Sequence, residues 1–207
     1  MASIQAITFD LGNVLIDFDH LIAARKIALL AGKTHSEIYN LFFDSVLIRS
    51  FEEGKISPEA FFVGVQQRID LDIPFEQFCL IWNSIFYLSD ENKAVYELMK
   101  SLRPRYTLSM LSNINELHYA YLKASTPWFD WFHHIFASCD MGVTKPDPRI
   151  YLKMLAVLGV EPAQVFYTDD RPEMVAAACA LGIKGFVYAG SAQLKKDLVF
   201  CGISIEG

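Results

Sequence analysis

Six polar side chains could do chemistry together. Asp10, Ser112, Asn113, Asp169 and Asp170 stand at the ends of short apolar runs, and Lys145 stands just before a predicted helix. Singly, each has a plain structural explanation. Asp, Ser or Asn after a strand usually caps a helix or forms a turn, and Lys before Pro is usually a solvated charge. The adjacent carboxylates of Asp169 and Asp170 are harder to explain, because two like charges at a strand end are costly unless a cation or donors receive them. Four such features at successive strand–helix junctions indicate one site.

This set of groups favours a hard cation and a phosphoryl group as ligands. Asp10 and Asp170, with a backbone carbonyl, could supply oxygen ligands to Mg²⁺, which keeps several waters and needs few protein carboxylates. Ser112 and Lys145 could hold a phosphoryl group, the Lys as a point charge. A carboxylate that faces a phosphate beside a metal can also act as the nucleophile and form an aspartyl-phosphate.

The elements that must position these groups alternate along the chain. Short apolar runs predict strands at 4–9, 106–111, 134–137, 164–168 and 184–188, and helical spacing predicts helices at 90–102, 115–124, 148–158 and 172–181. Strands that alternate with helices predict an α/β fold, with a parallel sheet covered on both faces. The carboxyl ends of parallel strands share one edge, so the six side chains should converge there.

One segment, from Phe18 to Leu88, interrupts this alternation with helical spacing alone. One face should carry Leu21, Ala24, Ala28 and Leu29, another Ile38, Leu41, Phe42 and Val46, and Ser57-Pro58 indicates a helix start. A third helix fits 75–85. We therefore expect a helical cap domain at 18–88, standing over the sheet edge, and an α/β core domain formed by 1–17 and 89–207.

Composition narrows the class of protein. The chain has 207 residues, is 53% apolar and carries a formal charge of −6, with no run of Lys or Arg. These values favour a globular fold and argue against nucleic acid or an anionic membrane as a partner. No secretory signal or bilayer-spanning run is visible, and the cysteines form no C-x-x-C pair; they are Cys79, Cys139, Cys179 and Cys201. We expect buried free thiols in a cytoplasmic protein, either a monomer or a homodimer.

Four motifs together resemble the haloacid dehalogenase-like superfamily over the whole chain. They are a strand followed by Asp10-Leu11-Gly12-Asn13-Val14-Leu15, a strand ending in Ser112, Lys145 in a T-K-P-D-P-x-I-Y stretch, and a strand ending in Asp169-Asp170. The resemblance implies a Rossmann-like sheet of order 5-4-1-2-3 and a helical cap after the first motif. It also implies catalytic roles for Asp10, Ser112 and Lys145, substrate contacts from Ser112, Asn113 and Lys145, and Mg²⁺ ligation by Asp10, the Gly12 carbonyl, Asp169 and Asp170.

Gly12 departs from the pattern of the family's phosphatases, which carry a second Asp there as general acid. Such proton transfer is typically worth about 100- to 10,000-fold in rate. The family's dehalogenases also lack this Asp, but they need no metal and do not keep the acidic pair. We therefore expect a Mg²⁺-dependent phosphatase of a small phosphorylated metabolite. The stretch D-L-G-N-V resembles the subgroup that includes hexose-1-phosphate phosphatases, whose anomeric leaving group depends less on an acid. A dehalogenase-type hydrolase and a catalytically weak binding relative are the alternatives.

Several other residues have competing explanations. Asp17 or Asp19 could replace the missing acid, although Asp19 also suits a helix N-cap. Arg49 could meet substrate, although an ion pair with Glu52 or Glu53 is the simpler expectation. The remaining candidates should be structural: the histidines at 133 and 134, and the aromatic cluster of Trp128, Phe129, Trp131 and Phe132.

Overall fold

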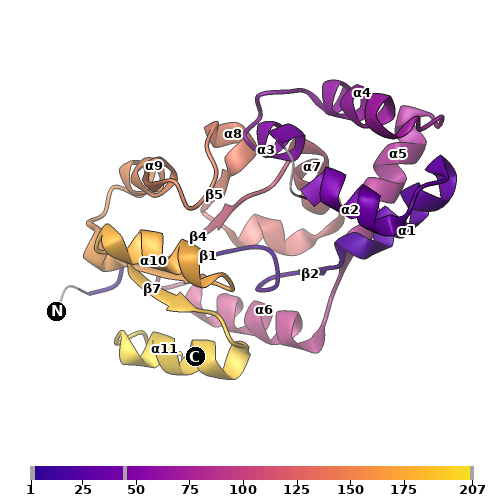
Figure 1. The fold of residues 1–207 in the computed structure, drawn as a ribbon. Coiled ribbons are helices and arrows are strands. Elements are labelled where there is room, and N and C mark those ends of the chain that lie inside the picture. Colours follow the sequence, from indigo (N-terminus) through magenta and orange to yellow (C-terminus); the bar gives the residue numbers. More distant parts are fainter. Residues whose placement is uncertain (1–2, 44–45, 206–207) are drawn as a thin grey trace.

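The computed structural model describes residues 3–43 and 46–205. Five parallel strands form one sheet in the order β5-β4-β1-β6-β7, which confirms the predicted α/β fold and strand order (Figure 1). These strands are β1 (Ala6–Phe9), β4 (Thr107–Ser112), β5 (His134–Ala137), β6 (Val165–Asp169) and β7 (Lys184–Val187). Each lies within two residues of its predicted bounds.

Helices cover both faces of the sheet. Successive side chains of the central strands point to opposite faces and are mostly apolar, so each face needs a covering layer. Ile7 and Phe9 of β1 join one apolar cluster with the helices at 90–102 and 191–200, whereas Ala6 joins the opposite cluster with the helices at 148–158 and 172–180. The helices and 3₁₀ turns of this part are α6 (Asp90–Leu102), α7 (Glu116–Ser125), η2 (Pro127–Trp131), α8 (Ser138–Met141), α9 (Pro148–Leu158), η3 (Pro162–Gln164), α10 (Pro172–Ala180) and α11 (Ser191–Phe200). The sequence reasoning did not predict α8 and α11.

A separate group of helices follows the first strand, and Figure 1 shows it beside one end of the sheet. It comprises α1 (His20–Ala31), α2 (His35–Phe43), α3 (Val46–Glu52), α4 (Pro58–Ile69), α5 (Phe75–Trp82) and the turn η1 (Asn83–Ile85). Its core is aromatic: the Phe61 ring stacks on Phe51 with centroids 4.4 Å apart and lies 5.0 Å from Trp82. This cluster is distinct from the two that flank the sheet, so the helical group has a core of its own.

Two details of the predicted helical faces are wrong. Leu29 is 86% exposed, because α1 buries its face through Ala23, Ala24, Ile27 and Ala28. Val46 is 83% exposed, because α3 buries Ile48 and Phe51 instead. The predicted face positions of Leu41 and Phe42 concern side chains that lie outside the described part of the structure. The predicted start of α4 is confirmed, since the Ser57 side chain accepts a hydrogen bond from the Ala60 amide and Pro58 opens the helix.

The purely helical spacing predicted for residues 18–88 is also wrong at both ends. The chain enters the helical group through β2 (Asp17–Phe18) and leaves through β3 (Phe86–Tyr87), and these two-residue strands pair antiparallel. Their pairing places the two crossings side by side. Elements this short carry no periodicity, which is why a pattern search misses them.

The cysteines are less buried than predicted. Cys179 is exposed, and Cys79, Cys139 and Cys201 are partly exposed; all four are free thiols. Among the helices that the structure describes, none has both the length and the apolar content needed to cross a bilayer.

Candidate active site

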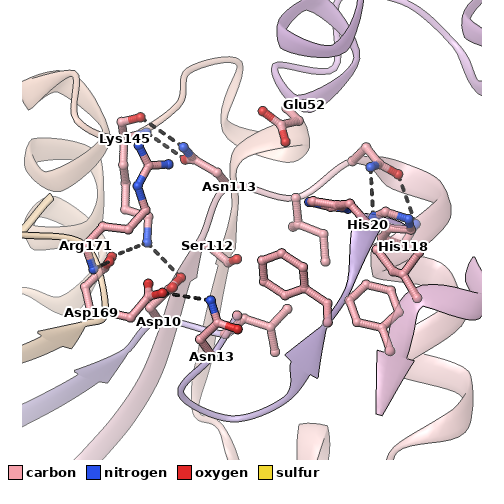
Figure 2. Close-up of a pocket in the computed structure, with 18 of the residues that line it drawn as sticks. Asp10, Asn13, His20, Glu52, Ser112, Asn113, His118, Lys145, Asp169 and Arg171 are labelled. Atoms are coloured by element: carbon pink, nitrogen blue, oxygen red, sulfur yellow. Dashed lines mark hydrogen bonds and ion pairs between the residues drawn. The ribbon is translucent and has the colours of Figure 1, made fainter. Parts of the chain in front are cut away.

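Asp10 lies at the carboxyl end of the central strand β1. The strand is fully buried, and the Asp10 amide extends its ladder by donating to the Thr168 carbonyl at 2.9 Å. Asp10 is 7% exposed and lines a cavity of about 210 Å³ between the sheet edge and the helical group. Figure 2 shows it on the sheet side of this cavity.

Lys145 connects the carboxylates at this edge. It is 4% exposed, and its Nζ lies 2.8 Å from Asp10 Oδ1 and 2.6 Å from Asp169 Oδ2. It also lies 2.9 Å from the Leu111 carbonyl and 3.2 Å from the Tyr167 hydroxyl. The ammonium therefore contacts four oxygens, which fixes its position beside Asp10.

The acidic pair at the end of β6 divides into two environments. Asp169 is fully buried: its Oδ2 accepts from Lys145 and from the Tyr167 hydroxyl, and its Oδ1 accepts from the Arg171 amide at 2.9 Å. Asp170 is partly buried, and its Oδ2 accepts from the Asn13 side chain at 2.8 Å. Asp169 therefore holds Lys145 in place, while Asp170 is more exposed.

Together, Asp10, Asp169 and Asp170 form the described cluster that suits a metal ion. Each offers a carboxylate oxygen, and these atoms lie within 4.8 Å of one another. The pKa of Asp10 is raised to about 6. Burial is the main cause, and the charge of Asp169 adds to it, while Lys145 acts in the opposite direction. Burial also raises the pKa of Asp170. Burial disfavours the charge on Lys145, but Asp10 and Asp169 outweigh it and raise its pKa. Three carboxylates around one ammonium leave an excess of negative charge, and a hard divalent cation fits this oxygen-only set.

Ser112 and Asn113 come from the end of β4 and line the same cavity. Ser112 is buried, and its side chain lies beside Asp10 at the sheet edge in Figure 2. The Asn113 side chain accepts from the Lys145 amide at 2.7 Å and donates to the Lys145 carbonyl at 2.9 Å. Asn113 therefore orients the loop that carries Lys145, a positioning contact that the sequence did not reveal.

Gly12 lines the cavity, and an aromatic ring lies where a side chain at this position would stand. A Cβ built on Gly12 would lie 2.6 Å from Cε1 of the Phe18 ring. The ring of Phe18 in turn lies 4.7 Å from the ring of His20, centroid to centroid. The space that a second Asp would need is therefore filled by an aromatic residue of β2.

The helical group and α7 supply the rest of the cavity wall, and sequence reasoning missed most of it. The lining residues from this side include Phe18, His20, Ile48, Glu52, Trp82 and His118. Figure 2 shows the Glu52 carboxylate pointing into the cavity from α3. The only sequence signal for Glu52 is an acidic side chain in a helix with a weak apolar pattern. Such side chains are common on protein surfaces, so this signal does not single Glu52 out.

The other sequence candidates lie outside this cavity. Asp19 caps α1 by accepting from the Leu21 amide at 2.8 Å, and Asp17 accepts from the Asn92 side chain at 3.2 Å. Arg49 is exposed. His133 has a structural contact, because its Nδ1 accepts from the Leu108 amide at 3.0 Å. In the aromatic cluster, Trp128, Phe129 and Phe132 are buried and Trp131 packs against them, as predicted.

Comparisons with known proteins agree with this architecture. The family model for haloacid dehalogenase-like hydrolases matches residues 4–182. D-ribitol-5-phosphate phosphatase of Bacteroides thetaiotaomicron is 26% identical over 206 residues, covering 94% of this chain and 97% of that protein. Flavin mononucleotide hydrolase 1 of Arabidopsis thaliana is 41% identical over 71 residues, only 34% of this chain and 29% of that protein.

A solved structure shares the fold. It is a HAD family enzyme from Bacteroides thetaiotaomicron in complex with magnesium and inorganic phosphate, with a TM-score of 0.80 and 24% identity over 90% of this chain and 95% of its own. The family match spans the helical group and the first four strands of the sheet along the chain, β1, β4, β5 and β6. The chain therefore belongs to the haloacid dehalogenase-like hydrolases, as its four motifs predicted.

Proposed function

We propose that this hydrolase is a Mg²⁺-dependent phosphatase that acts on a small phosphorylated metabolite through an aspartyl-phosphate on Asp10. The observation that carries the proposal is the Lys145 ammonium, held between Asp10 and Asp169 at 2.8 and 2.6 Å, with Asp170 beside them. This arrangement combines a buried nucleophile, a fixed cation for phosphoryl oxygens and an oxygen-only set for a metal.

Each residue has a defined part in the reaction. A carboxylate oxygen of Asp10 forms a bond to phosphorus, the bond from phosphorus to the ester oxygen breaks, and the departing oxygen takes a proton. Lys145 and the Ser112 hydroxyl hold phosphoryl oxygens during this step. Water then attacks phosphorus, which releases phosphate and restores Asp10.

Asp10, Asp170 and the Gly12 carbonyl would hold Mg²⁺ directly, and Asp169 through water, since both Asp169 oxygens already accept hydrogen bonds. When bound, Mg²⁺ supplies positive charge that offsets the charge of the phosphoryl oxygens. The excess of carboxylates over ammonium groups at this edge supports the assignment.

A small ester fits the size and composition of the cavity. Its volume of about 210 Å³ suits a phosphoryl group with a short polyol or a single sugar. The relative that acts on D-ribitol 5-phosphate supports a phosphorylated polyol, and the D-L-G-N-V stretch supports a hexose 1-phosphate. We propose these two classes as the first substrates to test.

The helical group is proposed to act as a cap domain of residues 18–88, and residues 1–17 and 89–207 as the core domain. Support comes from its separate aromatic core and from the paired crossings at β2 and β3. Ile48, Glu52 and Trp82 of this group line the same cavity as Asp10. Opening and closing of such a unit would control solvent access during turnover.

The test is phosphate release from an aryl phosphate, ribitol 5-phosphate, glucose 1-phosphate and glucose 6-phosphate, with Mg²⁺ added or removed by a chelator. We expect release that requires Mg²⁺. Metal-independent halide release from a 2-haloacid, with no phosphatase activity, would favour the dehalogenase alternative. No turnover on either class would favour the binding relative.

A further inference from the structure

The proposed reaction needs a proton at the departing oxygen, and position 12 cannot supply one. Phe18 occupies the space that a side chain at Gly12 would need. Asp17 and Asp19 are engaged by Asn92 and the Leu21 amide, and neither lines the cavity. The proton donor has to be sought among the groups that do line it.

Most titratable groups of the cavity are unsuited to this role. Burial lowers the pKa of His20 to about 4 and that of His118 to about 3, so both are neutral near pH 7. Lys145 is held by two carboxylates. Asp10 and the acidic pair are already assigned to the nucleophile and the metal, which leaves Glu52 among the described lining carboxyls.

Glu52 faces the cavity from the side opposite the sheet. It is the last residue of α3, is partly buried, and turns its carboxyl group into the cavity in Figure 2. Asp10 lies on the sheet side of the same cavity. A phosphate ester bound to Asp10, Ser112 and Lys145 would extend its leaving group toward the helical wall, where Glu52 stands.

The backbone of Glu52 is fixed to the core at this point. The Ser138 hydroxyl donates to the Glu52 carbonyl at 2.6 Å and accepts from the Ile114 amide at 2.9 Å, just beyond Asn113. Gly54, with φ of +63°, packs so closely that a Cβ there would lie 2.1 Å from the Cys139 carbonyl oxygen. The segment that carries Glu52 therefore has a defined position relative to the phosphate-binding edge.

The ionisation of Glu52 suits proton transfer near neutral pH. Burial raises the pKa of its carboxyl to about 7, Arg171 and Arg49 lower it, and Glu53 raises it. A carboxyl group in this range is partly protonated at pH 7 and can both donate and accept a proton.

We propose that Glu52 is the general acid that the Gly12 position lacks, an inference that rests on the proposed phosphatase function. As the bond from Asp10 to phosphorus forms and the ester bond breaks, the Glu52 carboxyl gives its proton to the ester oxygen, which leaves as an alcohol. The resulting carboxylate then takes a proton from the water that cleaves the aspartyl-phosphate.

Glu52→Gln tests this role, with Glu53→Gln as the matched control, since Glu53 pairs with Lys55 and lies outside the cavity lining. The measurement is single-turnover release of the leaving group from an aryl phosphate and from ribitol 5-phosphate. A phenol leaves without protonation, so Glu52→Gln should release it near the wild-type rate. Release of ribitol should slow by about 100- to 10,000-fold, while Glu53→Gln stays near wild type.

A pH profile provides the readout that a structural role would not change. In the wild type, kcat/KM for ribitol 5-phosphate should fall as pH rises above about 7, because Glu52 loses its proton. Glu52→Gln should lack this limb, whereas Glu53→Gln should keep it at a somewhat lower pH, because Glu53 raises the pKa of Glu52. Equal slowing of both leaving groups, or a raised KM alone, would overturn the inference. Wild-type protein inactive on both esters would instead overturn the proposed phosphatase function.

Discussion

The two walls of the cavity are built differently. On the sheet wall, Lys145 contacts four oxygens, and both oxygens of Asp169 accept hydrogen bonds. On the helical wall, Glu52 shares the cavity lining with the apolar side chains of Ile48, Trp82 and Phe18. The charged groups of the sheet wall are held by opposite charges and hydrogen-bond donors. On the helical wall, burial is the main influence on the pKa of the Glu52 carboxyl.

This difference separates two tasks. The sheet wall has the rigid, paired charges that phosphoryl transfer needs at fixed positions. The helical wall offers shape, aromatic surface and one proton carrier, which are properties that distinguish leaving groups. Changes on the sheet wall should therefore affect all substrates and the stability of the fold, while changes on the helical wall should depend on the substrate or on pH.

Lys145→Met should have the largest effect of the changes that probe this contrast. It leaves Asp10 and Asp169 buried without their shared cation, and breaking a buried ion pair typically costs about 3–5 kcal/mol. We expect the free energy of unfolding to fall by this amount in urea titrations, with loss of turnover on every ester.

Lys100→Met is the control for that change. Lys100 pairs with Glu97 on the surface of α6, where such pairs are worth about 0–1 kcal/mol. If the two variants lost similar stability, the sheet wall would not depend on its buried charges as described.

A smaller, pH-dependent effect is expected at His118 on the helical wall. Its Nε2 lies 3.1 Å from the Trp82 carbonyl, and burial lowers its pKa to about 3. Below pH 6.5 the unfolded chain takes up a proton at His118 that the folded protein does not. Its free energy of unfolding should therefore fall by up to about 1.4 kcal/mol per pH unit as the pH falls toward 3.

Urea unfolding of wild type and His118→Gln between pH 7 and pH 4.5 measures this contribution. The difference in unfolding free energy between the two proteins should shift in favour of the variant as pH falls. A difference that is constant with pH would show that His118 is not held neutral in the fold.

Asp19→Ala should have the smallest effect. It removes the N-cap of α1, which costs about 1 kcal/mol. Turnover of both aryl and alkyl phosphates should stay near wild type in steady-state assays, because Asp19 lies outside the cavity. A selective loss on alkyl phosphates would instead make Asp19 the proton donor and remove that role from Glu52.

The two walls also differ in how far the sequence predicts them. Asp10, Lys145 and Asp169 sit beside strands and loops whose spacing is set by the sheet, so their convergence was predictable from local patterns. Glu52 was not, because its position depends on how the helical group packs on α8 through Ser138 and Gly54. The space-filling role of Phe18 against Gly12 was hidden for the same reason, since a two-residue strand places it.

The central claim is that Asp10 is the nucleophile of a Mg²⁺-dependent phosphatase. The most direct measurement compares phosphate release from an aryl phosphate by wild type and Asp10→Asn, each with Mg²⁺ and with chelator, after circular dichroism has shown both to be folded. The account predicts Mg²⁺-dependent release by wild type and a fall of more than about 10,000-fold in the variant, because the attacking group is gone. Turnover by Asp10→Asn within about tenfold of wild type would contradict it.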